Sequence, residues 1–286
     1  MPTLSGSRLW LLVAAAMLAF AGNSVLCRLA LREGGIDAAS FTTLRLVSGA
    51  LVLWLIVRLR GGGSMRASGD MRSAFALFVY AAGFSFAYVT LSTGTGALLL
   101  FGAVQATMIG RGLAKGEHLS ALQWCGLALA LGGLVGLLLP GVSAPPVAGA
   151  LLMVAAGIAW GAYSLRGRGA GDATAKTAGN FIRAVPFALV LSLFLLRDAD
   201  VDAAGIVCAL VSGALTSGIG YAIWYTALPH LRATSAATVQ LSVPALAAIA
   251  GIALLGEPPT WRLALATFAI LGGIALVVRV KTRASG

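Results

Sequence analysis

The chain is built almost entirely from apolar stretches that are as long as a membrane-spanning helix and are joined by short connections. Ten such stretches follow one another along the sequence, at residues Leu9–Ala30, Ala39–Val57, Ala74–Leu91, Gly94–Gly110, Leu119–Leu139, Val147–Leu165, Ala178–Leu196, Ala204–Ala227, Ala233–Leu255 and Trp261–Val278. A helix needs about 20 predominantly apolar residues to cross the roughly 30 Å hydrocarbon core of a bilayer. The stretches are too long for barrel strands and lack their alternation of polar and apolar residues. The sequence therefore predicts an all-α integral membrane protein with ten transmembrane helices.

The composition excludes the main classes of non-membrane protein. Hydrophobic residues make up 59% of the 286 residues, charged residues only 10%, and the mean hydropathy is +0.94. A soluble domain carries roughly a quarter charged residues, so this chain lacks the charge to cover a water-facing surface. Disordered chains and disulfide-rich secreted scaffolds are excluded by the same figures.

The distribution of positive charge indicates topology rather than nucleic-acid binding. The net charge is +11, but the basic residues lie between apolar stretches and form no patch with interleaved aromatic residues. With the N-terminus in the cytoplasm, fourteen of the twenty Lys and Arg residues fall in cytoplasmic segments and three fall on the opposite side. Because cytoplasmic connections of membrane proteins are rich in Lys and Arg, we expect both termini to be cytoplasmic.

The two halves of the sequence repeat each other at an offset of 140 residues. The matching pairs are Ala19–Ser24 with Ala159–Ser164, Phe41 with Phe181, Gly116-Glu117 with Gly256-Glu257, Ser120 with Thr260, and Gly132-Gly133 with Gly272-Gly273. Each unit, residues 1–140 and 141–286, would hold five spans. Because five is odd, the second unit enters the membrane from the opposite side and is inverted. Inverted repeats are typical of secondary transporters that work by alternating access, with the substrate site near the bilayer midplane.

Several motifs in this repeat resemble a known family. Phe20-Ala21-Gly22-Asn23-Ser24 through Arg28, followed by Thr43-Leu44-Arg45, resembles the opening of an EamA-type unit of the drug/metabolite transporter superfamily, and so do the two Gly-Glu pairs with their following double glycines. The resemblance covers nearly the whole chain. Ala159–Tyr163 and Gly220–Trp224 resemble segments of the YddG-like amino-acid exporters. The resemblance implies a central cavity lined by spans 1, 3, 4, 6, 8 and 9, with spans 5 and 10 at the periphery.

The candidate cavity residues are polar or aromatic side chains in the middle of these spans. Asn23 and Ser24 occupy positions that match Tyr163 and Ser164 in the repeat. Polar groups at this depth either bond between helices or face a wet cavity, and their occurrence in both units favours a cavity wall. The full candidate set is Asn23, Ser24, Tyr80, Phe84, Tyr88, Phe101, Gln105, Trp160, Tyr163, Ser164, Tyr221, Gln240, Ser242 and Pro244.

One feature within this set admits a second interpretation, and another has a specific local role. Tyr80, Phe84 and Tyr88 recur every four residues and so share one helix face, which could line the cavity or face lipid. Pro244 is expected to free a backbone carbonyl in the helix interior, next to Gln240 and Ser242, where a substrate could bind it.

Three arginines lie inside or at the edges of the spans. We expect Arg28 and Arg45 to reach an interface or to pair with Glu33 and Asp37, because a charge in lipid is costly. The alternative role for these two residues and for Arg183 is a gate or an anchor for a substrate carboxylate.

Several kinds of chemistry are absent from the sequence. No Asp or Glu lies inside a span, there is no GxxxxGK[ST] phosphate-binding loop, and His118 and His230 lie in connections. Cys27, Cys125 and Cys208 are widely separated and lack metal-binding spacing. We therefore expect neither an enzyme nor a metal or cofactor site.

The sequence predicts a secondary transporter that exports neutral or aromatic amino acids and other small amphipathic metabolites across a bacterial inner membrane. Its partners would be this substrate and membrane lipid; the oligomeric state is open, and a monomer is compatible with the sequence. One alternative keeps the fold but carries drugs, nucleobases or sugar phosphates. A more remote alternative is a membrane scaffold that transports nothing.

Overall fold

The chain folds into a bundle of long helices. The computed structural model describes residues 6–32, 34–61, 68–116, 118–141, 144–167, 172–231, 236 and 239–281. The first half contains α1 (Gly6–Arg32), α2 (Ala38–Leu59), α3 (Met71–Tyr88), α4 (Thr93–Ala114) and α5 (Ala121–Leu138). The second half contains α6 (Val147–Gly167), α7 (Ala173–Phe194), α8 (Ala203–Val211), the π-helix η3 (Ser212–Ile219), α9 (Gly220–Ala227), α11 (Ser242–Leu255) and α12 (Trp261–Lys281). Because α8, η3 and α9 are continuous, these helices form ten spans, as the sequence predicts.

The described helices have the length and apolarity of membrane spans. Eight of them qualify by both criteria, and α11 is a shorter apolar helix. The eighteen-residue α3 is enclosed by α1, α2, α4, α6 and α7, so it faces protein more than lipid. This position explains why it can carry the buried Tyr80 and Tyr88, whereas Arg72 is exposed in its first turn.

The polarity of the molecule is that of a membrane protein. Large apolar side chains such as Leu11, Leu193 and Phe268 are exposed on the outside of the bundle. Polar side chains such as Asn23, Thr42 and Ser85 are buried inside it. Lipid accepts an apolar outer surface of this extent, whereas a soluble monomer does not.

Acidic residues in the connections start several of the helices. Asp37, Asp70, Asp172 and Asp202 occupy the N-cap positions of α2, α3, α7 and α8, and each carboxylate accepts backbone N–H groups of the first turn. These N–H groups have no partner within the helix, so the caps stabilise the helix starts. The cap at Asp172 also explains why α7 begins earlier than the predicted Ala178.

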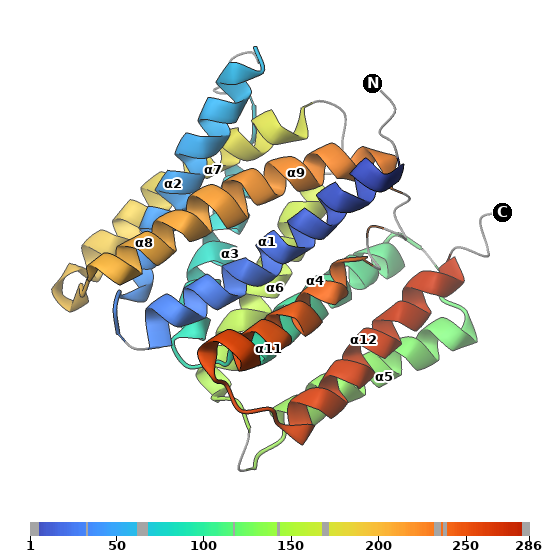
Figure 1. Cartoon of the computed structure of the whole chain (residues 1–286). Helices are drawn as coiled ribbons and strands as arrows, with labels where there is room; N and C mark the ends of the chain where they lie inside the picture. The colour runs from blue at the N-terminus through green and yellow to red at the C-terminus, as the bar shows by residue number, and fades with distance from the viewer. Residues whose placement is uncertain are drawn as a thin grey trace.

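The packing of the helices follows the repeat. In the repeat, α1 is equivalent to α6. The contact between α3 and α6 therefore corresponds to the contact between the α8–η3–α9 span and α1, and the contact between α4 and α6 corresponds to that between α11 and α1. Helices in equivalent positions also pair with each other, α2 with α7, α4 with α11 and α5 with α12. Figure 1 shows α5 and α12 side by side at one edge of the bundle. Each contact is retained when the helices of one half are exchanged for those of the other, as expected for two inverted five-helix repeats.

Glycines permit the closest of these contacts. At the α5–α12 interface, a Cβ atom added to Gly126 would meet the carbonyl oxygen of Gly273 and the Cβ atom of Leu276. The two backbones therefore approach each other directly, as small residues allow between membrane helices.

Two spans differ from the sequence prediction. The eighth span is not a uniform α-helix, because Ser212–Ile219 form a π-helix in its middle. In the ninth span the described helix α11 begins at Ser242, and residues 233–235 and 237–238 of the predicted range lie outside the described residues.

Candidate functional site

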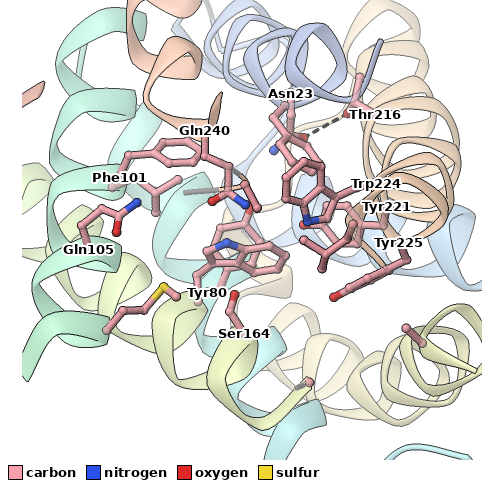
Figure 2. A pocket seen from close by; sticks show the side chains of 18 of the residues that line it. Asn23, Tyr80, Phe101, Gln105, Ser164, Thr216, Tyr221, Trp224, Tyr225 and Gln240 are labelled. Atoms are coloured by element: carbon pink, nitrogen blue, oxygen red, sulfur yellow. Dashed lines mark hydrogen bonds between the residues drawn. The ribbon is translucent and has the colours of Figure 1, made fainter. Parts of the chain in front are cut away.

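A cavity of about 460 Å³ lies in the middle of the bundle, between helices of the two halves. It is lined by Phe20, Asn23, Ser24, Tyr80, Phe84, Leu100, Phe101, Gln105, Met108, Trp160, Ser164, Gly167, Ala173, Thr216, Tyr221, Trp224, Tyr225, Leu228, Pro229, Leu231, Ala236 and Gln240 (Figure 2). Its volume lies within the roughly 300–1,000 Å³ of small-molecule sites, and its wall of apolar and aromatic side chains with a few polar groups is typical of them. α5 and α12 contribute no side chain to it.

The structure brings ten of the fourteen predicted residues together around this cavity and places the other four elsewhere. Tyr88 is buried one turn beyond the cavity, where its hydroxyl donates to the Thr93 carbonyl at 3.2 Å. Tyr163 is buried behind Trp160, with the two rings stacked at 5.3 Å, and its hydroxyl accepts from the Asn180 amide at 3.4 Å.

The two remaining residues belong to α11. Ser242 is exposed and donates to the Val239 carbonyl at 2.7 Å. Pro244 is buried in the first turn of α11 rather than in the middle of a long helix. Because a helix accepts proline in its first turn, the expected free carbonyl does not arise from a broken helix interior.

Asn23 is oriented by the π-helix. Its Oδ1 atom accepts a 2.7 Å hydrogen bond from the Ser212 hydroxyl and lies 3.2 Å from the Thr216 hydroxyl (Figure 2). The amide oxygen is thus the atom of the Asn23 side chain that faces both hydroxyls. The NH₂ group of Asn23 remains as a donor on the cavity wall.

Aromatic rings form one side of the cavity. The Trp160 ring lies 4.7 Å from the Tyr80 ring and 5.2 Å from the Tyr221 ring, measured between centroids. Phe20 contacts Tyr221 and Trp224 edge-on at 5.7 and 6.1 Å. These rings come from α1, α3, α6 and α9, so all four helices contribute to one apolar surface.

Arg45 of α2 lies directly behind this wall. Its side chain is 2% exposed, its Nη2 atom donates to the Tyr80 hydroxyl at 2.9 Å, and its Nε atom donates to the Ser217 hydroxyl at 3.2 Å. The guanidinium carbon lies 5.2 Å from the Tyr80 ring centre and 4.9 Å from that of Phe84. The expected pairing of Arg45 with Asp37 is not observed, since Asp37 caps α2 instead; Glu33 lies outside the described residues.

One end of the cavity is closed by a cluster of polar contacts. The Arg28 Nη1 atom donates to the carbonyls of Tyr88 and Val89, each at 2.9 Å, and its Nε atom lies 3.5 Å from Glu257 Oε1. The Glu257 carboxylate also accepts the backbone N–H of Thr93 at 2.9 Å and its hydroxyl at 3.0 Å. α1, the end of α3, the start of α4 and the α11–α12 connection are thereby held together.

Gly256 makes this closure possible. It follows α11 with a φ angle of +65°, a conformation that other residues rarely adopt, and it turns the chain so that Glu257 reaches the start of α4. A carboxylate at the N-terminus of a helix is favourable because it accepts unpaired N–H groups and interacts with the helix dipole.

The opposite end of the cavity reaches the surface. Gly167, at the end of α6, and Pro229, after α9, both line the cavity and are exposed. Near this end Arg166 pairs with Asp70 at 2.8 Å. Burial opposes ionisation of Asp70, but hydrogen bonds from Ser73 and the pairing with Arg166 prevail and lower its pKa to about 2.

Several lining residues lie outside the predicted set. Thr216 is among the most informative, because its hydroxyl helps to orient Asn23. Its signal in the sequence is the stretch Ser212–Gly218, whose small and polar residues are unusual in the middle of a span. Trp224 and Tyr225 carry no comparable signal, since aromatic residues near a span end are equally typical of an interfacial belt.

Comparison with known proteins places this architecture in a family. Residues 147–279 match the EamA-like transporter family. The uncharacterized protein PA1977 of Pseudomonas aeruginosa is 59% identical over 271 residues, covering 95% of this chain and 94% of that protein. An uncharacterized transporter of Archaeoglobus fulgidus is 27% identical over 290 residues, covering 96% of each chain.

A solved structure supports the fold independently. A crystal structure described only as that of a protein matches 93% of this chain and 99% of its own, with a TM-score of 0.65 and 18% identity. At this identity the likeness concerns the fold alone. Together with the family match and the related sequences, the ten spans identify this multi-pass membrane protein as a member of the EamA-like transporter family, within the drug/metabolite transporter superfamily.

Proposed function

We propose that the protein is a secondary transporter that exports neutral or aromatic amino acids and similar small amphipathic metabolites across a bacterial inner membrane. The observation that supports this most is a ligand-sized cavity between two sets of helices, open at one end and closed at the other. A cavity of this form is the arrangement that alternating access requires. The two repeat units are residues 1–140 and 141–286, and we propose that rocking of helix groups exposes the cavity to each side of the membrane in turn.

The basic residues support an assignment of the open end to the cytoplasm. Arg58, Arg72, Arg166 and Lys176 lie at or near helix ends on the same side as the open end of the cavity. Because cytoplasmic connections are rich in Lys and Arg, this side is the cytoplasmic one. The protein would then be in an inward-facing state, ready to accept a substrate from the cell.

The chemistry of the wall favours amino acids over other cargo. Sugar phosphates are bound by Lys or Arg side chains in direct contact, and cationic drugs by a carboxylate, and neither type of residue lines the described cavity. Aromatic rings with a few hydrogen-bonding groups suit a small molecule that has an apolar side chain and polar ends. Since no acidic residue lines the described part of the cavity, we propose that transport is uncoupled or weakly coupled to protons, with no covalent step.

Uptake into proteoliposomes tests this proposal. The purified protein is reconstituted in liposomes that are preloaded with unlabelled amino acid, and exchange of labelled threonine, methionine and phenylalanine is measured. We expect exchange above that of protein-free vesicles for at least one of them, and its loss in Trp160→Ala. The matched control is Trp124→Ala, since Trp124 is 52% exposed on α5, away from the cavity. Exchange no greater than in protein-free vesicles for all three would refute the choice of substrate.

Protection from cationic dyes distinguishes the alternative cargo. Cells that produce the protein should gain no resistance to such dyes if amino acids are the substrate. Clear resistance that Trp160→Ala abolishes would favour a drug exporter of the same fold.

A further inference from the structure

Arg45 is a buried charge for which the described part of the chain supplies no counter-ion. A guanidinium stays protonated in proteins, and a charge within a membrane protein is costly unless it is paired. Its side chain contacts two neutral hydroxyls and two aromatic rings, and its Nη1 atom is buried without a hydrogen bond to any described residue.

The other two arginines in the spans are satisfied differently. Arg28 pairs with Glu257, and the Arg183 Nη1 atom donates to the carbonyls of Ser68 and Gly179 at 2.7 and 3.0 Å. Arg28 lies about one turn from the end of α1, and Arg183 lies in the middle of α7 with its charge directed to backbone carbonyls. Arg45 instead lies two turns inside α2, beside the cavity.

One aromatic layer separates Arg45 from the cavity. Tyr80 and Phe84 line the cavity on one side and contact the guanidinium on the other. Arg45 donates to the Tyr80 hydroxyl oxygen, so the hydroxyl proton is directed to another acceptor. The positive charge also polarises this O–H group and makes it a stronger donor.

The polar groups near this layer are suited to an anion. The Asn23 oxygen is occupied by hydroxyls of the π-helix, which leaves its NH₂ group as a donor in the same cavity. No acidic side chain lines the described cavity to oppose the charge of Arg45. Because the dielectric constant of a protein interior is low, the charge of Arg45 is weakly screened and acts strongly on a ligand on the other side of the Tyr80 and Phe84 rings.

We propose that Arg45 makes the cavity selective for ligands that carry a carboxylate, which the Tyr80 hydroxyl and the Asn23 amide bind directly. Arg45 is a positioning residue in this scheme, since it acts through Tyr80 and through its electrostatic potential. An ammonium group on the ligand is not required; where present, it faces the rings of Trp160 and Tyr221. The inference rests on the proposed function in taking this cavity as the substrate site.

Three ligands with the same ring separate the contributions of the two charged groups. Phenylalanine has both groups, 3-phenylpropanoate lacks the ammonium group, and 2-phenylethylamine lacks the carboxylate. Binding to the purified full-length protein is measured by calorimetry. We expect both carboxylates to bind and the amine to bind at least about tenfold more weakly, because a hydrogen bond in which one partner is charged has an effect of this size.

Substitutions then test the role of Arg45. Arg45→Met should reduce the affinity for both carboxylates about tenfold or more and remove the preference over the amine, whereas Arg45→Lys should retain part of it. Tyr80→Phe removes only the hydroxyl and should also reduce the affinity for both carboxylates and the preference over the amine. It therefore tests the inference if Arg45→Met does not fold. Arg183→Met is the matched control, because it removes a span arginine that donates to the backbone carbonyls of Ser68 and Gly179, whereas Arg45 contacts the cavity-lining Tyr80.

The outcomes separate this inference from the proposed function. Equal binding of the amine and 3-phenylpropanoate, an unchanged preference in Arg45→Met or Tyr80→Phe, or no binding of either carboxylate at millimolar concentration overturns the inference. Exchange of labelled phenylalanine together with equal binding of the amine overturns the inference and leaves the transport proposal intact. Arg45-dependent binding of carboxylates without exchange of any amino acid overturns the transport proposal and leaves the inference about Arg45 intact.

Discussion

Arg28 of α1 and Glu257 of the α11–α12 connection form an ion pair, with Nε and Oε1 3.5 Å apart, at the closed end of the cavity. The two residues are far apart in the sequence and belong to different halves of the chain. Glu257 also accepts both donors of Thr93 at the start of α4. One carboxylate therefore connects α1 and α4, two helices that line the cavity.

Neutralising this carboxylate should loosen the closed end. In Glu257→Gln the ion pair with Arg28 is lost and the hydrogen bonds from Thr93 weaken, since bonds to a charged acceptor contribute about 1.5–3 kcal/mol. We expect a population shift of roughly tenfold toward a state open at this end. Spin labels at Val89→Cys and Pro258→Cys, in a background without native cysteines, should show a second, longer distance. Asp198→Asn, on an exposed residue of the short helix at 196–198, is the control, and an unchanged distance distribution in Glu257→Gln would contradict the prediction.

Asn23→Asp should strongly reduce transport. An aspartate retains an oxygen that accepts from Ser212 and Thr216, but it replaces the NH₂ donor of the cavity wall with a second acceptor. We expect exchange to fall by at least about tenfold. Asn23→Ala should lower both exchange and the unfolding temperature, because it leaves the Ser212 hydroxyl without its acceptor, while the Thr216 hydroxyl keeps the Ser212 carbonyl at 2.7 Å. Equal exchange in Asn23→Asp and the unsubstituted protein would show that this amide does not contact the substrate.

The α5–α12 interface should affect stability but not substrate affinity. A methyl group added in Gly126→Ala meets the backbone of Gly273 and the side chain of Leu276, and overpacking of this kind costs about 1–3 kcal/mol. We expect a lower unfolding temperature in detergent and an unchanged KM in proteoliposomes. Gly132→Ala on the same helix is the matched control, because nothing lies within 4 Å of the added atom. A large change of KM in Gly126→Ala would mean that this peripheral pair acts on the cavity.

Asp70 should stabilise the open end over the whole physiological pH range. Its pKa of about 2 in the folded protein lies below the roughly 3.9 of an unfolded chain. The stability that it contributes is therefore present above about pH 4 and is lost as the pH falls toward 2. The difference in unfolding temperature between the unsubstituted protein and Asp70→Asn should stay constant from pH 8 to pH 5 and shrink below pH 4. A difference that already shrinks between pH 7 and pH 5 would contradict the assignment.

Much of the fold follows from the sequence, because span length and the five-helix repeat are local or periodic properties. The polar and aromatic mid-span residues Asn23, Gln105 and Trp160 were sufficient to locate the cavity wall. The spacing of Tyr80, Phe84 and Tyr88 predicts a shared helix face but not where the cavity ends. Because the closed end lies between Phe84 and Tyr88, the last ring is sealed inside the bundle.

Other features of the site depend on contacts between distant segments, which a local sequence pattern does not predict. The π-helix at Ser212–Ile219 has no periodic signature, yet it supplies the hydroxyls that orient Asn23. Arg28 meets Glu257 only after both halves have assembled. The environment of Arg45 likewise combines residues of α2, α3 and η3, so its lack of a counter-ion could not be read from the sequence.

Access to one cavity from both sides of the membrane is tested most directly by labelling a single cysteine at Ser24, which lines the cavity next to its closed end. Cys27, Cys125 and Cys208 are first replaced, and a membrane-impermeant thiol reagent is applied to either face of oriented vesicles. We predict labelling from the face at the open end, additional labelling from the opposite face in the Glu257→Gln background, and protection from both faces by a transported amino acid. Labelling from one face only, unchanged by Glu257→Gln and by every amino acid, would contradict alternating access through this cavity.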